Sequence, residues 1–452
     1  MPPVGWSLVA WFAVAPMLIA TRDRPWTIRA AAGSLGGVVW GLGTVGWWLI
    51  PALRNHLGAG TAEAAMMTIA ATWLYAGVYL AVFALVYPWL GRPRWLAAAA
   101  VWVLLESLRG RLLGGMPWAH LGHALAARDH LSQIADVAGV AGLSLLPALA
   151  AAAAAERGRA RWTGLTITAV LVVAATGYGR WRLDVLAASA RPERGVSMQV
   201  VSGLHPQADR VAAYAAATRA GFDLVIWPET AVPGHLQDDP AAAATVARVA
   251  RAHRGLLLGS PRWDGRGDAR RYYNAAWLVD SSGTVRTVYD KRRLVPFAER
   301  APIRAFELLR RPFAPGANPE PLDVHGLRLG VLVCWEALFG DLAAAYARGG
   351  ADVLVNLTSD EGLGGGAAQM LAFSRLRAIE TRRWLLRASG TGASVAVDPL
   401  GRLLEITDLA LAPGRARPDT IHTRHGGWIP AVLVVIVLVA QLRGGVRTAR
   451  RG

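Results

Sequence analysis

Long apolar runs fill roughly the first 180 residues and the C-terminal end of the chain, whereas shorter alternating segments lie between them. Each run is near the length of ~20 residues that a helix needs to cross a bilayer. The pattern predicts seven membrane-spanning helices, at roughly 4–20, 30–51, 64–91, 95–113, 132–155, 163–179 and 428–442. No basic residue precedes the first run, so we expect a membrane helix there and not a cleavable signal peptide.

The arginines indicate which connections face the cytoplasm. Basic residues accumulate in cytoplasmic loops of membrane proteins. Here they occupy every second connection and the C-terminal tail: Arg22 and Arg24; Arg92 and Arg94; Arg157, Arg159 and Arg161; Arg443, Arg447, Arg450 and Arg451. We therefore expect a transmembrane bundle over 1–180, an extracytoplasmic domain over 181–427, and a C-terminal helix with a basic cytoplasmic tail over 428–452.

Composition agrees with a membrane protein and narrows the function classes. The mean hydropathy is +0.31, and 54% of the residues are hydrophobic. The net charge of +17 is explained by arginines beside apolar runs, so it does not indicate a nucleic-acid partner. A single cysteine excludes an intramolecular disulfide, and the chain lacks metal-binding and nucleotide-binding motifs, so we expect no metal and no cofactor.

From about residue 195 short apolar segments alternate with amphipathic ones, which is typical of an α/β domain. Strands are predicted at Val196–Val201, Leu224–Trp227, Gly255–Gly259, Ala275–Val279, Leu327–Val333, Val353–Leu357 and Ala393–Val397. Helices are predicted at 207–220, 240–253, 338–349 and 367–383.

Three chemically distinct side chains each follow an apolar strand or a strand-turn unit. Glu229 comes after the apolar segment 224–227, Cys334 is the only cysteine and follows 327–333, and Lys291 is the one lysine among 48 basic residues. If strand ends bring them together, they supply a general base, a nucleophile and a cation for an oxyanion. Each also has an ordinary explanation: a helix-capping or ion-paired carboxylate, a solvated basic run, and a small core residue.

The sequence around these residues resembles a known family. Glu229 lies in W-P-E-T, Lys291 in Y-D-K-R-R-L-V-P-F-A-E and Cys334 in V-C-W-E. In this order and spacing the blocks resemble the Glu-Lys-Cys triad of the nitrilase superfamily. With the flanking apolar runs, the chain is most similar to its membrane-embedded branch, the apolipoprotein N-acyltransferases. The resemblance implies a helical membrane bundle joined to a nitrilase-like αββα sandwich.

The resemblance also assigns supporting residues. Glu299 matches a second family glutamate that assists the tetrahedral intermediate or holds Lys291. Trp335 and Glu336 match positions that support the nucleophile, and the backbone N–H of Trp335 is a natural oxyanion donor. Asn274 is expected to cap or crosslink strands without a catalytic duty.

Two blocks depart from the family pattern. The family's Q-G-N-I is Ser202-Gly203-Leu204-His205 here, and in the family's S-N-D-x-W-F-G block, which corresponds to 358–364, Ser359, Gly362 and Leu363 replace Asn, Trp and Phe. Both changes bear on substrate handling more than on bond making. The chain also shows one span fewer than the family's usual eight, so we expect that the first family helix is missing or lies upstream of Met1.

A loop in the membrane part has two interpretations. The sequence G-M-P-W, which ends at Trp118, resembles a family G-x-P-W loop that could line a lipid entrance. The alternative is a simple glycine–proline turn with an interfacial tryptophan.

The predicted function is transfer of a fatty acyl chain from a membrane phospholipid, through a Cys334 thioester, to the N-terminal diacylglyceryl-cysteine amine of an apolipoprotein. We expect a monomer in the bacterial inner membrane. Alternatives are a membrane-tethered nitrilase-type amidase that hydrolyses a C–N bond, or a catalytically altered homologue that binds lipoproteins. A transporter is disfavoured by the scarcity of charges within the spans.

Overall fold

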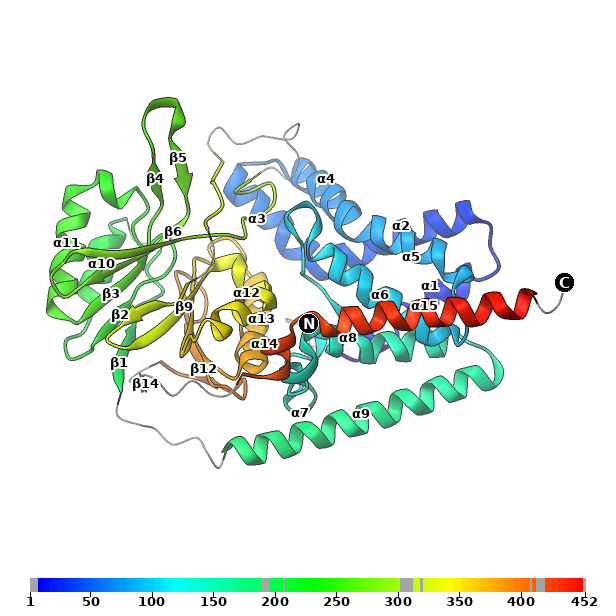
Figure 1. The fold of residues 1–452 in the computed structure, drawn as a ribbon. Coiled ribbons are helices and arrows are strands. Elements are labelled where there is room, and N and C mark those ends of the chain that lie inside the picture. Colours follow the sequence, from blue (N-terminus) through cyan, green and yellow to red (C-terminus); the bar gives the residue numbers. More distant parts are fainter. Residues whose placement is uncertain are drawn as a thin grey trace. The chain divides into compact units, whose positions relative to one another are not determined.

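The computed structural model describes residues 7–187, 195–205, 208–300, 312–317, 320–406, 409–411 and 419–449 (Figure 1). The chain forms two compact units. Unit 1 comprises Met1–Asp184, Gly362–Gln369 and His425–Gly452, and unit 2 comprises Val185–Glu361 and Met370–Arg424. The sequence predicted boundaries at 180 and 427, which placed Gly362–Gln369 in the α/β domain. In the structure this segment belongs to the helical unit 1.

Unit 1 is built from helices. The main ones are α1 (Ala15–Thr21), α2 (Trp26–Gly41), α3 (Trp47–Leu57), α4 (Thr61–Thr72), α5 (Val78–Val86), α6 (Arg94–Arg109), α8 (Ala135–Ala154), α9 (Gly158–Ala187) and α15 (Trp428–Ala449). One π-helical turn joins α2 to α3 (Leu42–Gly46), and another joins α4 to α5 (Trp73–Gly77). A Cβ on Gly37 would lie only 2.5 Å from Gly77 Cα, so this crossing requires glycine.

Four helical runs of the described chain are long and apolar enough to cross a membrane: Trp26–Asn55, Thr61–Trp89, Ala135–Ala154 and Gly158–Val185. They confirm four of the predicted spans. Ser7–Thr21 and Trp428–Leu442 are shorter apolar helices. The run predicted at 95–113 forms α6, which has 16 residues and ends at Arg109, so it is shorter than expected.

Unit 2 contains two six-stranded sheets. The first has the order β14-β1-β2-β3-β6-β7 and the second β13-β12-β11-β10-β9-β8. The first sheet consists of β14 (Leu409–Leu411), β1 (Val196–Val200), β2 (Leu224–Ile226), β3 (Gly255–Gly259), β6 (Ala275–Asp280) and β7 (Val285–Asp290). The second consists of β13 (Leu403–Leu404), β12 (Val395–Val397), β11 (Trp384–Ser389), β10 (Val353–Thr358), β9 (Leu327–Val333) and β8 (Leu322–Val324). A separate hairpin pairs β4 (Arg262–Asp264) with β5 (Arg271–Tyr273).

Helices cover the outer faces of both sheets. In Figure 1, α10 (Arg210–Ala217) and α11 (Pro240–Ala252) lie against the first sheet, and α12 (Gly340–Arg348) and α13 (Gly366–Thr381) lie against the second. Strands β1, β2 and β3 are parallel, as are β9, β10 and β11. Every residue of β2 and β10 is buried, as expected for parallel strands covered on both faces. The α-helical bundle with an αββα sandwich is therefore confirmed.

The predicted strands and helices of unit 2 are present within a few residues, but seven described strands were missed: β4, β5, β7, β8, β11, β13 and β14. Strand β7 leads into Lys291, β11 contains Arg387, and β8 is a short edge strand. The segment 301–311 after Glu299 lies outside the described residues.

Candidate active site

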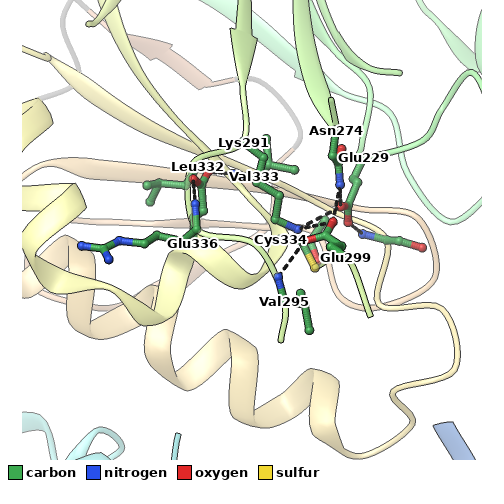
Figure 2. A network of polar contacts seen from close by, with 12 residues as sticks. Glu229, Asn274, Lys291, Val295, Glu299, Leu332, Val333, Cys334 and Glu336 are labelled. Atoms are coloured by element: carbon green, nitrogen blue, oxygen red, sulfur yellow. Dashed lines mark hydrogen bonds and ion pairs between the residues drawn. The ribbon is translucent and has the colours of Figure 1, made fainter. Parts of the chain in front are cut away.

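Three strand ends bring the predicted triad together. Glu229 follows β2, Lys291 follows β7 of the same sheet, and Cys334 follows β9 of the second sheet. Figure 2 shows the three side chains converging on one another, with Glu299 beside them. The ordinary explanation of Lys291 as part of a solvated basic run is wrong, because its side chain is buried, whereas Glu229 is ion-paired, with Lys291 itself.

Lys291 is enclosed by two carboxylates. Its side chain is 1% exposed, and its Nζ lies 3.0 Å from Glu299 Oε1 and 3.6 Å from Glu229 Oε1. Burial alone would lower the pKa of Lys291. The negative charges of Glu299 and Glu229 and the nearby Cys334 raise it by more, so the net shift is upward. The ammonium therefore stays charged at neutral pH and acts as a fixed positive charge.

Asn274 is a site residue that sequence reasoning missed. Its Nδ2 donates to Glu229 Oε1 at 2.8 Å and to Glu299 Oε1 at 2.9 Å, so one amide links the two carboxylates (Figure 2). We expected only a strand cap or crosslink at this position. The only signal in the sequence was its place at the start of an apolar strand, which did not reveal the carboxylates that it would meet.

Glu299 is held from both sides. Its Oε2 accepts from the Val295 backbone N–H at 2.8 Å, while Oε1 accepts from Lys291 and Asn274. The resulting turn fixes the carboxylate against the ammonium. This geometry agrees with the expectation that Glu299 holds Lys291.

Cys334 occupies an unusual backbone conformation directly after β9. Its φ is +50°, and the thiol is half-buried. Desolvation raises the pKa of the thiol above its ordinary value, Glu229 raises it further, and Lys291 lowers it only in part. The thiol therefore stays protonated at neutral pH in this environment.

Positive φ angles gather around the site. Thr230, Phe297 and Asp360, each beside or close to a site residue, have φ of 56°, 64° and 55°. Such conformations cost of order 1–3 kcal/mol each and cluster at functional sites.

Glu336 accepts hydrogen bonds from the backbone at the ends of two strands. Its Oε2 accepts from Val333 N–H at 2.8 Å, and its Oε1 accepts from the N–H groups of Arg292 at 2.8 Å and Arg293 at 3.1 Å. The Tyr289 hydroxyl also donates to it, at 2.8 and 3.0 Å. One buried carboxylate thus ties the end of β9 to the end of β7, which keeps Cys334 and Lys291 in register.

Trp335 follows Cys334 in the 3₁₀-helix Cys334–Leu338 and is buried. Its ring lies 6.3 Å from that of Phe339, centroid to centroid. Its support of Cys334 and its backbone N–H as an oxyanion donor both stay predictions.

Within unit 1, Trp118 is buried rather than interfacial. It is 2% exposed, its ring lies 4.8 Å from that of Trp48, and its Nε1 donates to Gln369 Oε1 at 2.6 Å. Gln369 Nε2 in turn donates to Thr44 O at 3.0 Å. The interfacial-tryptophan interpretation is therefore wrong, and Gly362–Gln369 is integrated into the helical unit through this tryptophan.

Comparison with known proteins assigns the family. The family described as "Apolipoprotein N-acyltransferase N-terminal domain" matches residues 1–153, and "Carbon-nitrogen hydrolase" matches residues 188–409. An apolipoprotein N-acyltransferase of Geobacter metallireducens is 30% identical over 94% of this chain and 88% of its own length. One from Sinorhizobium medicae is 33% identical over 89% of this chain and 82% of its own.

Among solved structures, an amidase from Nesterenkonia sp. AN1 covers 52% of this chain and 98% of its own, with 23% identity and a TM-score of 0.36. The two curated relatives span nearly the whole chain, helical unit included. The chain belongs to the apolipoprotein N-acyltransferase family.

Proposed function

We propose that the protein N-acylates apolipoproteins through a covalent thioester on Cys334. The observation that carries the proposal is the grouping of Glu229, Lys291 and Glu299 around the only thiol of the chain. A nucleophile with an adjacent base and a fixed cation is the arrangement that acyl transfer requires.

In the first step, Glu229 takes the proton from Cys334 Sγ as the sulfur attacks an ester carbonyl of a phospholipid. The charge that develops on the carbonyl oxygen is stabilised by the Lys291 ammonium and by the backbone N–H of Trp335. The ester C–O bond then breaks, and the leaving lysophospholipid oxygen takes the proton from Glu229. The acyl group is now a thioester on Cys334.

In the second step, the N-terminal amine of a diacylglyceryl-cysteine attacks the thioester carbonyl. Glu229 accepts a proton from the amine, the C–S bond breaks, and the proton returns to sulfur. The products are an N-acylated lipoprotein and the free enzyme. No external oxidant, metal or cofactor is needed for the proton and electron balance.

The apolar helices support a lipid donor. Diacyl chains lose about 0.8 kcal/mol for each methylene moved into water, so a lipid-using enzyme gains by working within the bilayer. The arginine distribution supports unit 2 on the extracytoplasmic side of the inner membrane.

The test is mass spectrometry of the intact protein purified from membranes. The expected result is a long-chain acyl adduct on Cys334 that hydroxylamine removes and that Cys334→Ala lacks. Adding a diacylglyceryl peptide should discharge the adduct onto the peptide amine. Acyl transfer that persists in Cys334→Ala would refute the mechanism. Discharge to water alone would instead indicate an amidase-like hydrolase, and a wild-type protein that never forms the adduct would indicate a binding homologue.

A further inference from the structure

Beside Glu229, a hydrogen bond joins the two sheets. Glu229 follows β2 of the first sheet, and its Oε2 accepts from the backbone N–H of Ser359 at 2.9 Å. Ser359 follows β10, which pairs directly with β9, the strand that leads into Cys334. The base is therefore tied to the sheet of the nucleophile through one amide.

His205 lies on the other side of Ser359. The imidazole is 1% exposed, and its Nδ1 lies 3.0 Å from Ser359 Oγ. The backbone supports the same contact, because His205 N–H donates to Gly390 O at 3.3 Å, and Gly390 N–H donates to Thr358 O at 2.9 Å. A Cβ on Gly390 would overlap the imidazole ring, so the histidine fits against bare backbone.

We propose that His205 and Ser359 are positioning residues for Glu229. The imidazole fixes the Ser359 hydroxyl, which aims the Ser359 N–H at Glu229 Oε2 and leaves Oε1 turned toward Asn274 and Lys291. This inference rests on the proposed role of Glu229 as general base. It names a contact that the base needs in addition to the triad.

The loop is already anchored without His205. The buried Asp360 carboxylate accepts from Arg387 Nη2 at 2.8 and 2.6 Å and from Ser389 Oγ at 2.7 Å. This ion pair holds the loop to its own sheet. The imidazole is therefore not needed for the fold of the loop, and its contribution is to orient Ser359 toward Glu229.

The imidazole is neutral at working pH. Burial and the charge of Arg210 lower the pKa of His205 to about 4, although the carboxylates of Glu361 and Asp360 oppose the shift. A neutral ring can share a proton with the serine hydroxyl, whereas a charged ring would add a cation beside Glu229.

The two residues are also two of the positions at which the sequence departs from the family blocks that it resembles. His205 replaces the isoleucine of Q-G-N-I, and Ser359 replaces the asparagine of S-N-D. Their side chains contact each other, so the two changes form one structural unit.

The experiment is single-turnover acylation of Cys334 by phospholipid in mixed micelles, measured on the full-length protein across pH. Ser359→Ala keeps the amide and removes the hydroxyl. His205→Leu removes the ring nitrogens, His205→Asn keeps a polar atom near the Nδ1 position, and His205→Gln places one near Nε2 instead.

We expect His205→Leu to slow acylation roughly fivefold to tenfold, the effect of one lost hydrogen bond. Ser359→Ala should slow it at least as much, because the Ser359 hydroxyl also accepts from Glu361 N–H at 3.3 Å. The double variant should be no slower than Ser359→Ala, because both changes break the contact between His205 and Ser359. His205→Asn should stay within about twofold of wild type and His205→Gln should not. In the two slowed variants, Ser359→Ala and His205→Leu, the apparent KM for phospholipid should stay unchanged. In a plot of their acylation rate against pH, the acid limb should move to higher pH.

The inference would be overturned if the losses of acylation rate in the two single variants added up in the double variant. Equal rates for His205→Asn and His205→Leu, or a wild-type rate in Ser359→Ala, would overturn it as well. Melting temperatures of all variants separate misfolding from misalignment, and Ser359→Ala serves as the test if the histidine variants do not fold. A wild-type protein that forms no thioester would refute the proposed function instead, so the two failures are distinguishable.

Discussion

Replacing Glu336 with glutamine should weaken the link between the end of β9, which leads into Cys334, and the segment after β7. The carboxylate accepts three backbone N–H groups, from Val333, Arg292 and Arg293, and the Tyr289 hydroxyl, with no exposed surface. Glutamine has one oxygen, so its NH2 must face either Val333 N–H or the other two. At least one buried donor is then left without an acceptor.

The expected cost follows from these contacts. An unpaired buried donor costs about 1–3 kcal/mol, and the bonds that remain lose the benefit of a charged acceptor, about 1 kcal/mol each. Burial raises the pKa of Glu336 even though the three N–H groups oppose it, so part of the cost of holding a buried charge is recovered in the variant. We expect a net loss of about 3 kcal/mol, concentrated at the ends of β7 and β9.

The assay is hydrogen exchange by mass spectrometry on the protein in detergent, together with the acylation rate of Cys334. Glu336→Gln should speed exchange of the Val333, Arg292 and Arg293 amides by about 100-fold, the equivalent of ~3 kcal/mol. The matched control is Asp341→Asn, which removes an exposed ion pair with Arg293 worth at most about 1 kcal/mol. Unchanged exchange and acylation in Glu336→Gln would refute the reasoning.

Three further predictions concern the charges of the site. Lys291→Gln should abolish measurable acylation and lower stability, because Glu229 and Glu299 would face each other without a cation. A wild-type acylation rate in Lys291→Gln would contradict the electrostatic role of Lys291. Asn274→Asp should lower the acylation rate more than Asn274→Ala does, since it adds a third carboxylate where an amide bridges two; the reverse order would refute the bridging role. Burial lowers the pKa of His205 to about 4 in the folded protein, against 6.5 in an unfolded chain, so the unfolded chain binds the proton first as the pH falls. The melting temperature should therefore decrease as the pH is lowered from 6.5 to 4, and His205→Asn should make it less dependent on pH.

Glu229 and Cys334 could be singled out from the sequence because each follows an apolar strand that is recognised locally, whereas Lys291 stood out only as the single lysine and through its motif. Strand β2 before Glu229 is entirely apolar, and β9 before Cys334 carries no charged residue after Arg328, which is how strands buried on both faces appear. Strand β7, which delivers Lys291, was missed because its first three residues are exposed and include Arg286. An edge strand with a solvated face carries a weaker signal than a central one.

Residues that act through distant partners could not be predicted. Arg387 interrupts the apolar pattern of β11, and only the structure reveals its partner Asp360, 27 positions earlier. Asn274 and the Ser359 amide act on Glu229 across 45 and 130 positions. Their roles depend on how the two sheets meet, which no local pattern encodes.

The grouping of Gly362–Gln369 with the helical unit is a further example. A Cβ on Gly365 or Gly366 would overlap the rings of Trp47 and Trp48, so the glycines allow close packing against these tryptophans. In the sequence, the same glycines indicate only a turn. The partner tryptophans lie more than 300 positions away, beyond the range of any periodicity.

The distances around Lys291 explain why the site contains two carboxylates. A base paired tightly with an ammonium is a poor proton acceptor, because the cation stabilises its charged form. Lys291 lies within hydrogen-bond distance of Glu299 at 3.0 Å, whereas Glu229 lies farther away at 3.6 Å. Glu299 therefore forms the close ion pair with Lys291, and Glu229 is the carboxylate that accepts the thiol proton in the proposed mechanism. Proton transfer then leaves the net charge of the pocket unchanged, so the protein need not reorganise around a new buried charge as the thioester forms.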